Sequence, residues 1–254
     1  MRRALLPGVA LWSCLLVPIG AAAQTSLSVA PLRIALTPAR PVASLTMGNA
    51  EAAEVAVQAE VVHWSQDRDG NDIYEPTRDV LVNPAIFRLP AGGRQIVRLG
   101  LQVPAEARER SYRIFLRQLP RDQALPQDGA DGAKVQTLLR IGVPVFVPPA
   151  QPPQRVLNWS LQADRAGPAR LVLDNQGNEH IQITQLAVRR DNGAQLLRKN
   201  LSLYVLAGQS VGIPLELLAP LPPDTRLQIE AATDAPEAKS SATVRVPRAP
   251  GEPR

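Results

Sequence analysis

Side chains that commonly catalyse reactions or bind metals are few in this sequence and lie far apart. The histidines, His63 and His180, fall in different halves of the chain, and the single cysteine, Cys14, lies near the N-terminus. Metal sites need clustered ligands, and a nucleophilic serine or cysteine needs a base beside it. The sequence also lacks a glycine-rich phosphate loop and a nucleophile-elbow serine. We therefore expect no cofactor, no metal and no enzyme activity.

Close pairs of acidic residues are the remaining candidates for acid–base chemistry. Glu106 and Glu109 form one pair, and Asp67 and Asp69 form another. Most carboxylates in proteins are exposed to water. We expect all four to be solvated loop charges, and a hydrolase would need a catalytic constellation that we do not find.

The N-terminus has the order of a cleaved secretory signal peptide. Two arginines precede an apolar stretch from Ala4 to Ile19, and small residues from Ala21 to Ala23 follow it. The apolar stretch is shorter than the ~20 residues that a membrane-spanning helix needs. We predict that residues 1–23 are removed together with Cys14. The mature protein would then be exported, not membrane-embedded and free of disulfides.

Charge and aromatic content argue against a nucleic-acid partner. The chain has 28 basic and 23 acidic residues, so loss of the two arginines in the signal peptide leaves 26 against 23 and a formal charge of +3. Aromatic residues make up only 4% of the chain. A nucleic-acid binder would show a concentrated basic stripe or aromatic stacking platforms.

Segments of alternating apolar and polar residues follow one another in both halves of the chain. They are residues 53–62, 79–84, 85–89, 95–101 and 111–118 in the first half, and residues 169–174, 181–189, 195–205, 210–217, 226–231 and 242–246 in the second. No long stretch has a helical period. Many short strands with glycine and proline turns are typical of a sandwich or a barrel, so we predict an all-β protein.

Prolines mark a boundary near the middle of the chain. Four of them cluster between Pro148 and Pro153, and proline-rich linkers act as semi-rigid spacers between domains. We predict a first domain over residues 24–149, a second over residues 150–247 and a disordered tail over residues 248–254.

The segment from Leu27 to Leu36 changes its apolar face in the middle. Leu27 and Val29 lie at odd positions, whereas the apolar residues after Pro31 lie at even positions. A slip of one residue turns every side chain to the opposite face. We expect the strand to bulge or to pass from one sheet to the other at Pro31. Arg33 then points away from the apolar face, either as a solvated edge residue or as a binding group.

The segment from Lys134 to Val147 is unusually long for an apolar strand. Its odd positions carry valine, threonine, leucine or isoleucine throughout. At ~3.3 Å per residue it would extend beyond ~40 Å, about twice an ordinary strand. Either the whole run is buried, or its first half projects from the core and pairs with another chain. The preceding glycine-rich loop, residues 126–132, would let that half re-pair.

Several stretches of this sequence occur together in one known family. They are PLRI at residues 31–34, LTMGN at 45–49, VVHW at 61–64, VNPAIF at 82–87, GGRQIVR at 92–98, SYRIFL at 111–116, RIGVPVF at 140–146 and LVLDNQGN at 171–178. In these stretches and their order the chain resembles the PapD-like family, the periplasmic pilus chaperones of the chaperone-usher pathway. The ending of the long strand is similar to that of the branch that assembles thin, archaic-type pili.

The resemblance implies a fold, a function and two partners. The fold would be two immunoglobulin-like β-sandwiches joined in an L shape. The protein would fold and stabilise pilus subunits, which lack one strand, and deliver them to an outer-membrane usher. In the family, the last strand of the first domain fills the subunit's gap by donor-strand complementation. That donor strand here is residues 134–147, and its client-facing positions are Val135, Thr137, Leu139 and Ile141.

The resemblance also implies a site for the client's C-terminal carboxylate between the domains. Arg33 matches the family's arginine, and a guanidinium forms charge-assisted, bidentate bonds with carboxylates. The family's lysine falls at Gly142 or Pro144 and is not matched. Arg140, the nearest cation of the same strand parity, is the expected substitute.

A surface-displayed or pilus-subunit protein with a structural or adhesive role is the alternative. A subunit would usually carry its own donor extension near the mature N-terminus, whereas the candidate strand here ends the first domain. Self-association of the free protein through that strand is left open.

Overall fold

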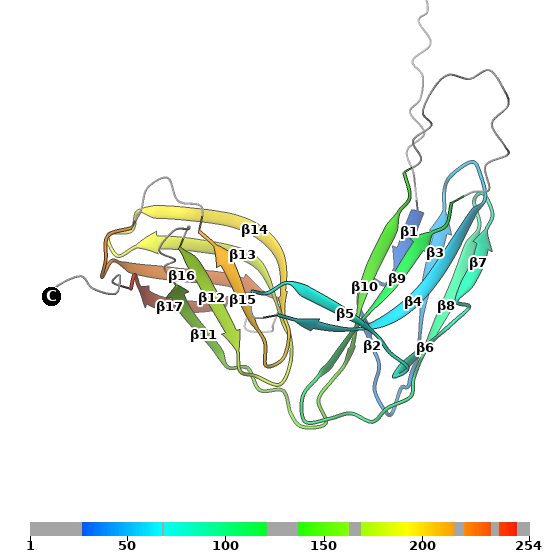
Figure 1. Cartoon of the computed structure of the whole chain (residues 1–254), viewed down its shortest axis with the longest axis horizontal. Coiled ribbons are helices and arrows are strands. Elements are labelled where there is room, and N and C mark those ends of the chain that lie inside the picture. The colour runs from blue at the N-terminus through cyan, green and yellow to red at the C-terminus, as the bar shows by residue number, and fades with distance from the viewer. Residues whose placement is uncertain are drawn as a thin grey trace, which may run out of the picture.

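The molecule consists of β-strands arranged in two bodies. The computed structural model describes residues 27–67, 69–120, 137–162, 169–215, 221–234 and 239–247. Within them every regular element is a strand, the strands form four sheets, and no helix is long and apolar enough to cross a membrane. Figure 1 shows the two bodies meeting at an angle. The predicted all-β class, with two sandwiches in an L shape, is confirmed.

The first domain contains ten strands in two sheets. They are β1 (Leu27–Ala30), β2 (Ile34–Ala35), β3 (Val42–Asn49), β4 (Val55–Gln66), β5 (Asp72–Pro76), β6 (Val80–Asn83), β7 (Ile86–Leu89), β8 (Arg94–Leu101), β9 (Arg110–Gln118) and β10 (Arg140–Val147). One sheet has the order β1-β3-β8-β6. The other has the order β2-β10-β9-β4-β5, with β7 also beside β4.

The second domain contains seven strands in two sheets. They are β11 (Leu157–Gln162), β12 (Arg170–Asn175), β13 (Ile181–Arg190), β14 (Gln195–Val205), β15 (Ser210–Pro214), β16 (Arg226–Thr233) and β17 (Lys239–Arg245). The orders are β11-β12-β15 and β14-β13-β16-β17.

Each domain has its own hydrophobic core between its two sheets. In the first, Leu45 of β3, Val57 of β4, Val97 of β8 and Ile114 of β9 are fully buried. In the second, residues such as Leu173 of β12 take the same role. Successive side chains of a strand point to opposite faces, so the period-two alternation in the sequence supplies one inward row per strand.

The first strand passes from one sheet to the other, which is one of the two outcomes that its change of face predicts. β1 pairs with β3 in one sheet, whereas β2 pairs with β10 in the other. Ile34 and Leu36 are buried after the switch, but Leu32 is exposed and does not join that apolar face. Arg33 lies in the short connection between β1 and β2, at the side of the second domain.

Three strands that the alternation did not predict are β3, β5 and β11. β5 exposes both of its faces, so its residues carry no alternating pattern. It is held by pairing with β4 from Pro76 to Asp72, and β11 is held by pairing with β12. Strand formation here depends on a neighbour and not on local sequence. The predicted signal peptide and tail lie outside the described residues, and the predicted domain boundaries remain predictions.

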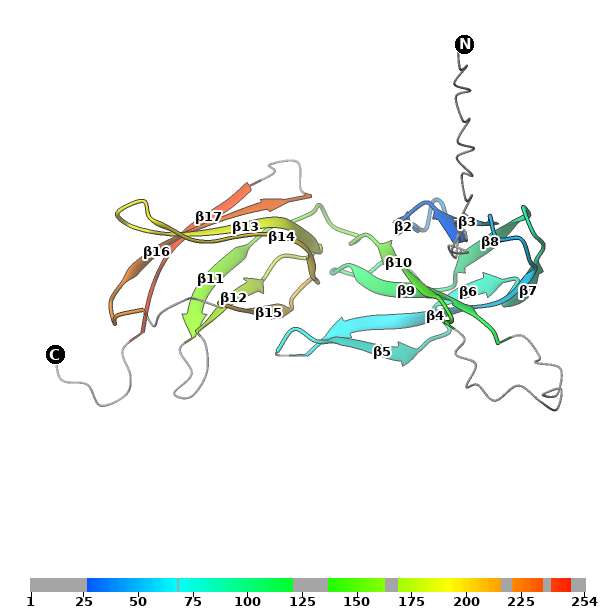
Figure 2. The ribbon, with the colours of Figure 1, turned by 90° about the horizontal axis from the view of Figure 1, so that it is seen from above.

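The two domains touch at a hairpin and at a small apolar cluster. In both Figure 1 and Figure 2 the β4–β5 hairpin extends from the first domain towards the second. The cluster consists of Trp64, Phe146 and Leu206, which are almost fully buried, with Tyr74 and Tyr204 packed against it. Burial of these aromatic rings holds the domains against each other at the base of a cleft.

Candidate functional site

A cleft of about 890 Å³ lies between the two domains. Its first-domain wall is the outer face of the sheet that contains β4, β9 and β10, together with Leu32 and Arg33. Its second-domain wall is formed by Gln182 of β13 and by residues of β14 that include Tyr204. The cleft therefore brings together residues that lie far apart in the chain.

Arg33 crosses the cleft and binds the second domain. Its Nη1 lies 2.7 Å from Oδ2 of Asp234. Its Nη2 donates to Oε1 of Gln182 at 2.6 Å and to the hydroxyl oxygen of Tyr204 at 3.1 Å. Burial alone would lower the pKa of Arg33, but the contacts with Tyr204 and Asp234 outweigh it and raise the pKa above its ordinary value. Arg33 is thus a charged, partnered residue at the domain boundary.

Arg113 of β9 is a second arginine in the same cleft, and the sequence reasoning did not identify it. Its guanidinium lies 3.9 Å from the ring centre of Trp64. Its Nη1 donates to the hydroxyl of Tyr74 at 2.6 Å and pairs with Asp72 at 3.3 Å. Burial and the hydrogen bond to Asp72 raise the pKa of Tyr74 to about 12, against the opposing effect of Arg113. These contacts hold Arg113 in one orientation.

Gly142 and Pro144 leave room for the side chain of Arg113. Pro144 lies directly opposite Arg113 in the β9–β10 register. A Cβ atom on Gly142 would lie 2.9 Å from Cε1 of Phe115 and 3.2 Å from Cδ of Arg113. A lysine at position 142 would therefore require the ring of Phe115 to shift and would crowd the side chain of Arg113. Of the arginines on β9 and β10, the one that lines the cleft is Arg113 of β9.

Arg140 lies outside this group of cleft residues. It is exposed, and its guanidinium lies 3.5 Å from the ring centre of Phe115. The lining of the cleft on β10 begins at Ile141 and does not include Arg140. Its predicted role in binding a carboxylate remains a prediction.

Over residues 140–144, one edge of β10 carries no neighbouring strand in the part of the chain that the structure describes. β9 pairs with β10 along its whole length from Arg140 to Val147. On the other edge β2 pairs only with Val145 and Phe146. The backbone groups from Arg140 to Pro144 thus face outward on that side, and such an edge is able to accept another strand.

The client-facing positions predicted on this strand lie progressively farther from the protein's own core. Ile141 packs partly against the core, Leu139 is half-buried and Thr137 is exposed, whereas Val143 is fully buried. Val135 lies outside the described residues. The first domain therefore covers the side chains of this apolar row less and less towards the N-terminal end of the row.

The histidines serve the fold in this structure. Nδ1 of His180 lies 2.7 Å from Oε1 of Glu109, and the His180 ring stacks on Phe146 at 3.7 Å between ring centres. His63 packs edge-on against Tyr112. No group of acidic or histidine side chains in the described ranges is placed to hold a metal ion.

The expectation that Glu109 is a solvated loop charge is wrong. Its side chain is only 2% exposed and pairs across the domain boundary with His180. Position 109 lies next to the start of β9, where the second domain covers it. No pattern within a single chain segment reports such covering. Its neighbour Glu106 is exposed and pairs with Arg110, as expected for a surface charge.

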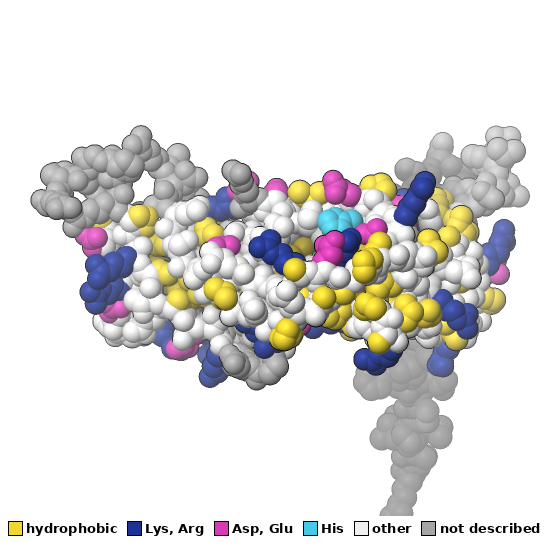
Figure 3. Space-filling model, turned by 90° about the horizontal axis from the view of Figure 1, so that it is seen from below, with side chains coloured by type: hydrophobic (Ala, Val, Ile, Leu, Met, Phe, Trp, Pro, Cys, Tyr) yellow, Lys and Arg dark blue, Asp and Glu magenta, His cyan; other side chains and the backbone are white. Residues whose placement is uncertain are grey.

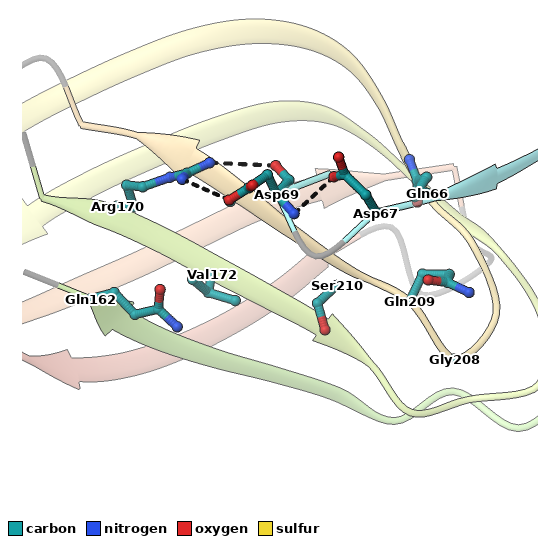
Figure 4. Close-up of a pocket in the computed structure, with 10 residues that line it drawn as sticks. Gln66, Asp67, Asp69, Gln162, Arg170, Val172, Gly208, Gln209 and Ser210 are labelled. Carbon is teal, nitrogen blue, oxygen red and sulfur yellow. Dashed lines mark hydrogen bonds and ion pairs between the residues drawn. The ribbon is translucent and has the colours of Figure 1, made fainter. Parts of the chain in front are cut away.

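A second hollow between the domains, of about 590 Å³, lies beside the tip of the β4–β5 hairpin. Figure 4 shows Arg170 of β12 reaching to Asp69, with Asp67 beside it. The Arg170 Nη1 to Asp69 Oδ1 distance is 3.0 Å. Asp67 accepts hydrogen bonds from the backbone of Asp69 and Asn71, and this shapes the turn. The polar groups at this hollow join the domains, so we assign them a structural role.

Exposed apolar side chains concentrate on the first domain. In Figure 3 the yellow side chains gather on the right-hand half, where that domain lies. Val42 of β3 and Leu81 of β6 flank Gly100 of β8 in one cross-strand row, and both side chains are more than half exposed. An exposed apolar row of this kind is a candidate surface for contact with another protein.

Comparison with known proteins points to one family. The family model described as pili and flagellar-assembly chaperone, PapD N-terminal domain, matches residues 26–153. A search of curated protein sequences gave no match.

Solved structures of similar fold include pilus chaperones. One is a chain of the CsuC-CsuE chaperone-tip adhesion subunit pre-assembly complex from archaic chaperone-usher Csu pili of Acinetobacter baumannii, with 19% identity over 86% of this chain and 98% of that chain and a TM-score of 0.65. The E. coli chaperone DraB has 21% identity over 87% and 96%, with a TM-score of 0.55. The Salmonella enterica SafA pilin complex with the SafB chaperone gives 15% over 90% and 99%, with a TM-score of 0.55. At these identities the likeness shows the fold.

Proposed function

Because this chain belongs to the family of pili and flagellar-assembly chaperones, we propose that it folds and stabilises pilus subunits by donor-strand complementation. The proposal is supported by the edge of β10 from Arg140 to Pro144, which has no neighbouring strand among the described residues. The apolar side chains of this segment are also less buried in the first domain towards its N-terminal end. A subunit that lacks a strand would pair with this edge through main-chain hydrogen bonds.

The donor positions would be Val135, Thr137, Leu139 and Ile141. Leu139 and Ile141 offer aliphatic side chains that the first domain only partly covers. Thr137 is smaller and more polar, so its pocket in the client would be shallow. Alternate side chains of a donor strand give specificity, while the backbone gives most of the pairing.

The client's terminal carboxylate would bind in the cleft at Arg33. Arg33 lines the cleft and contacts the second domain. A guanidinium is the side-chain group best suited to bind a carboxylate. Arg140 is the second cation proposed from the sequence. The geometry of Gly142 favours Arg113 for the same task, because Arg113 lines the cleft.

The mature protein would act in the periplasm and pass its client to an outer-membrane usher. The predicted signal peptide over residues 1–23 supports export. The exposed row formed by Val42 and Leu81 offers a surface for a further partner. Chaperones of this family are in general not enzymes.

Co-expression with secreted subunits tests the function. The tagged wild-type chain should yield a stable one-to-one complex with a pilus subunit from a periplasmic extract. Arg33→Ala should reduce the recovered complex about tenfold or more, since a charge-assisted bond contributes ~1.5–3 kcal/mol. Arg189→Ala is the matched control, because Arg189 pairs with Glu230 at 3.0 Å on the outer face of the second domain. Full recovery with the Arg33 variant would exclude its role, and a wild-type chain that recovers no subunit would exclude the function.

A further inference from the structure

In the free protein the carboxylate of Asp234 forms an ion pair with Arg33. Asp234 follows β16 in the second domain, and its Oδ2 lies 2.7 Å from Nη1 of Arg33. Nη2 of Arg33 is taken by Gln182 and Tyr204. Both terminal nitrogens of the guanidinium therefore have partners from the second domain. These are the same nitrogens that would donate hydrogen bonds to an incoming carboxylate.

Asp234 is held in place independently of Arg33. Its Oδ1 accepts a hydrogen bond from the backbone N–H of Gln182 at 2.8 Å. Its own backbone N–H donates to the carbonyl of Gln182 at 3.0 Å. The carboxylate is thus fixed relative to the second domain by the β13–β16 pairing, and it offers its free oxygen at the position where Arg33 reaches across.

We propose that Asp234 is an internal stand-in for the client's terminal carboxylate. In the free protein it neutralises Arg33, and a client binds fully only by displacing it. This inference rests on the proposed function and adds a regulation to the same site. An intramolecular competitor acts at a high effective concentration, so a carboxylate alone displaces it poorly. A ligand that also pairs with the edge of β10 has the additional binding energy to do so.

The stand-in has two consequences for the binding cycle. It discriminates against unrelated carboxylates, because they lack the strand that pairs with β10. It also favours release, since Asp234 pairs with Arg33 again as the client leaves, so that Arg33 keeps a charged partner throughout. Arg33 and Asp234 belong to different domains, so client binding removes one tie between them.

Asp234→Asn tests the stand-in, because asparagine keeps the acceptor for Gln182 and removes the charge. The probe is a peptide of alternating threonine and valine with a fluorophore on its N-terminal amine and a free C-terminal carboxylate, compared with the same labelled peptide as a C-terminal amide. Fluorescence anisotropy should show about tenfold tighter binding of the acid to the variant. Binding of the amide should not change. Glu230→Gln on the same strand is the control, since Glu230 also pairs with an arginine but lies away from the cleft.

A second measurement needs no client. Phenylglyoxal modifies accessible arginines, and mass spectrometry of peptides resolves the rate at Arg33. We expect the rate at Arg33 to rise several-fold in Asp234→Asn and to stay unchanged in Glu230→Gln. In Arg33→Ala the Asp234 substitution should no longer alter binding of the acid peptide, because the two residues act as one unit.

The outcomes separate this inference from the proposed function. Weaker binding of the acid peptide to Asp234→Asn would overturn the inference and make Asp234 a positioning residue for Arg33. Unchanged binding and unchanged Arg33 modification would also overturn it. A faster Arg33 modification with no peptide or subunit bound by any variant would support the stand-in contact and count against the proposed function.

Discussion

At the scale of single residues, aromatic rings and carboxylates fix the positions of the arginine side chains in the cleft. Arg113 lies against Trp64 and is tied to Tyr74 and Asp72, while its Nε is buried without a hydrogen-bond partner among the described residues. A fixed guanidinium loses less conformational entropy on binding than a mobile one. In the proposed function Arg113, which lines the same cleft as Arg33, would therefore bind an anionic group at a small entropic cost.

Paired substitutions distinguish Arg113 from Arg140 as the second cation. We expect Arg113→Gln to lower the affinity for a subunit about tenfold, because a charge-assisted contact in the cleft is lost. Arg140→Gln should change it by less than about threefold, since Arg140 is exposed on the ring of Phe115. Titration of each purified variant with the subunit measures the difference. The reverse order would assign the role to Arg140, as proposed from the sequence.

At the scale of elements, β10 changes character along its length. From Val143 to Val147 its inward side chains belong to the core of the first domain. Towards its N-terminal end, Leu139 is only half-buried and the outer edge has no neighbouring strand in the described residues. One strand thus serves folding at one end and is available for binding at the other.

Leu139→Glu tests this division at the residue that directly precedes β10. The free protein should keep its melting temperature within a few degrees, because Leu139 contributes little to its own core. Subunit binding should collapse, since a charge would enter a dry groove at a cost of several kcal/mol. A thermal melt and a pull-down on the same preparation provide the two readouts.

Leu138→Glu is the matched control for that experiment. Leu138 is the adjacent residue, has the same side chain and is 40% exposed. It should leave both stability and binding nearly unchanged. Global unfolding of the Leu139 variant would show instead that Leu139 belongs to the core, and retained binding would refute the donor role at this position.

At the scale of the whole molecule, the β4–β5 hairpin acts as a strut between the domains. Gly70 at its tip has a φ of 84° and packs against Val211 of β15. Asp69 pairs there with Arg170, and Gln66 bonds the backbone of Tyr204 and Leu206. Together with the apolar cluster around Trp64, these contacts set the angle between the two domains. That angle determines the shape of the cleft in which Arg33 lies.

Gly70→Ala should loosen the angle between the domains. The added Cβ would lie 2.7 Å from Cγ1 of Val211, so the tip must move away from the second domain. Gly193→Ala is the control, because Gly193 has a φ of 82° but open space around it. Both variants bear the cost of ~1–2 kcal/mol for an L-residue at positive φ. Solution scattering should show a bent, elongated particle for wild type and control, and a broader distance distribution for Gly70→Ala alone. Identical profiles would exclude the strut.

The sequence by itself determined the class of the fold and the family. Period-two alternation and turn residues are local signals, so the all-β class followed from them. The parity change at Pro31 predicted either a bulge or a passage between sheets, and the structure shows the passage. The motifs identified the family that the later comparison showed. Strands such as β5, which expose both faces, were missed because their pairing partner and not their own pattern forms them.

The surroundings of the site were decided only by the tertiary structure. Arg33 meets Gln182 and Tyr204 across separations of 149 and 171 positions, and Glu109 meets His180 across 71. The domains dock through aromatic residues and the β4–β5 hairpin, and that docking alone determines which charges are covered. A periodic pattern indicates on which face of its strand a side chain lies. It does not indicate which residues of a second domain pack against that side chain. Arg33 was singled out by its match to the family's arginine and does line the cleft, whereas the contacts of Arg113 and Asp234 and the burial of Glu109 could not be read from the sequence.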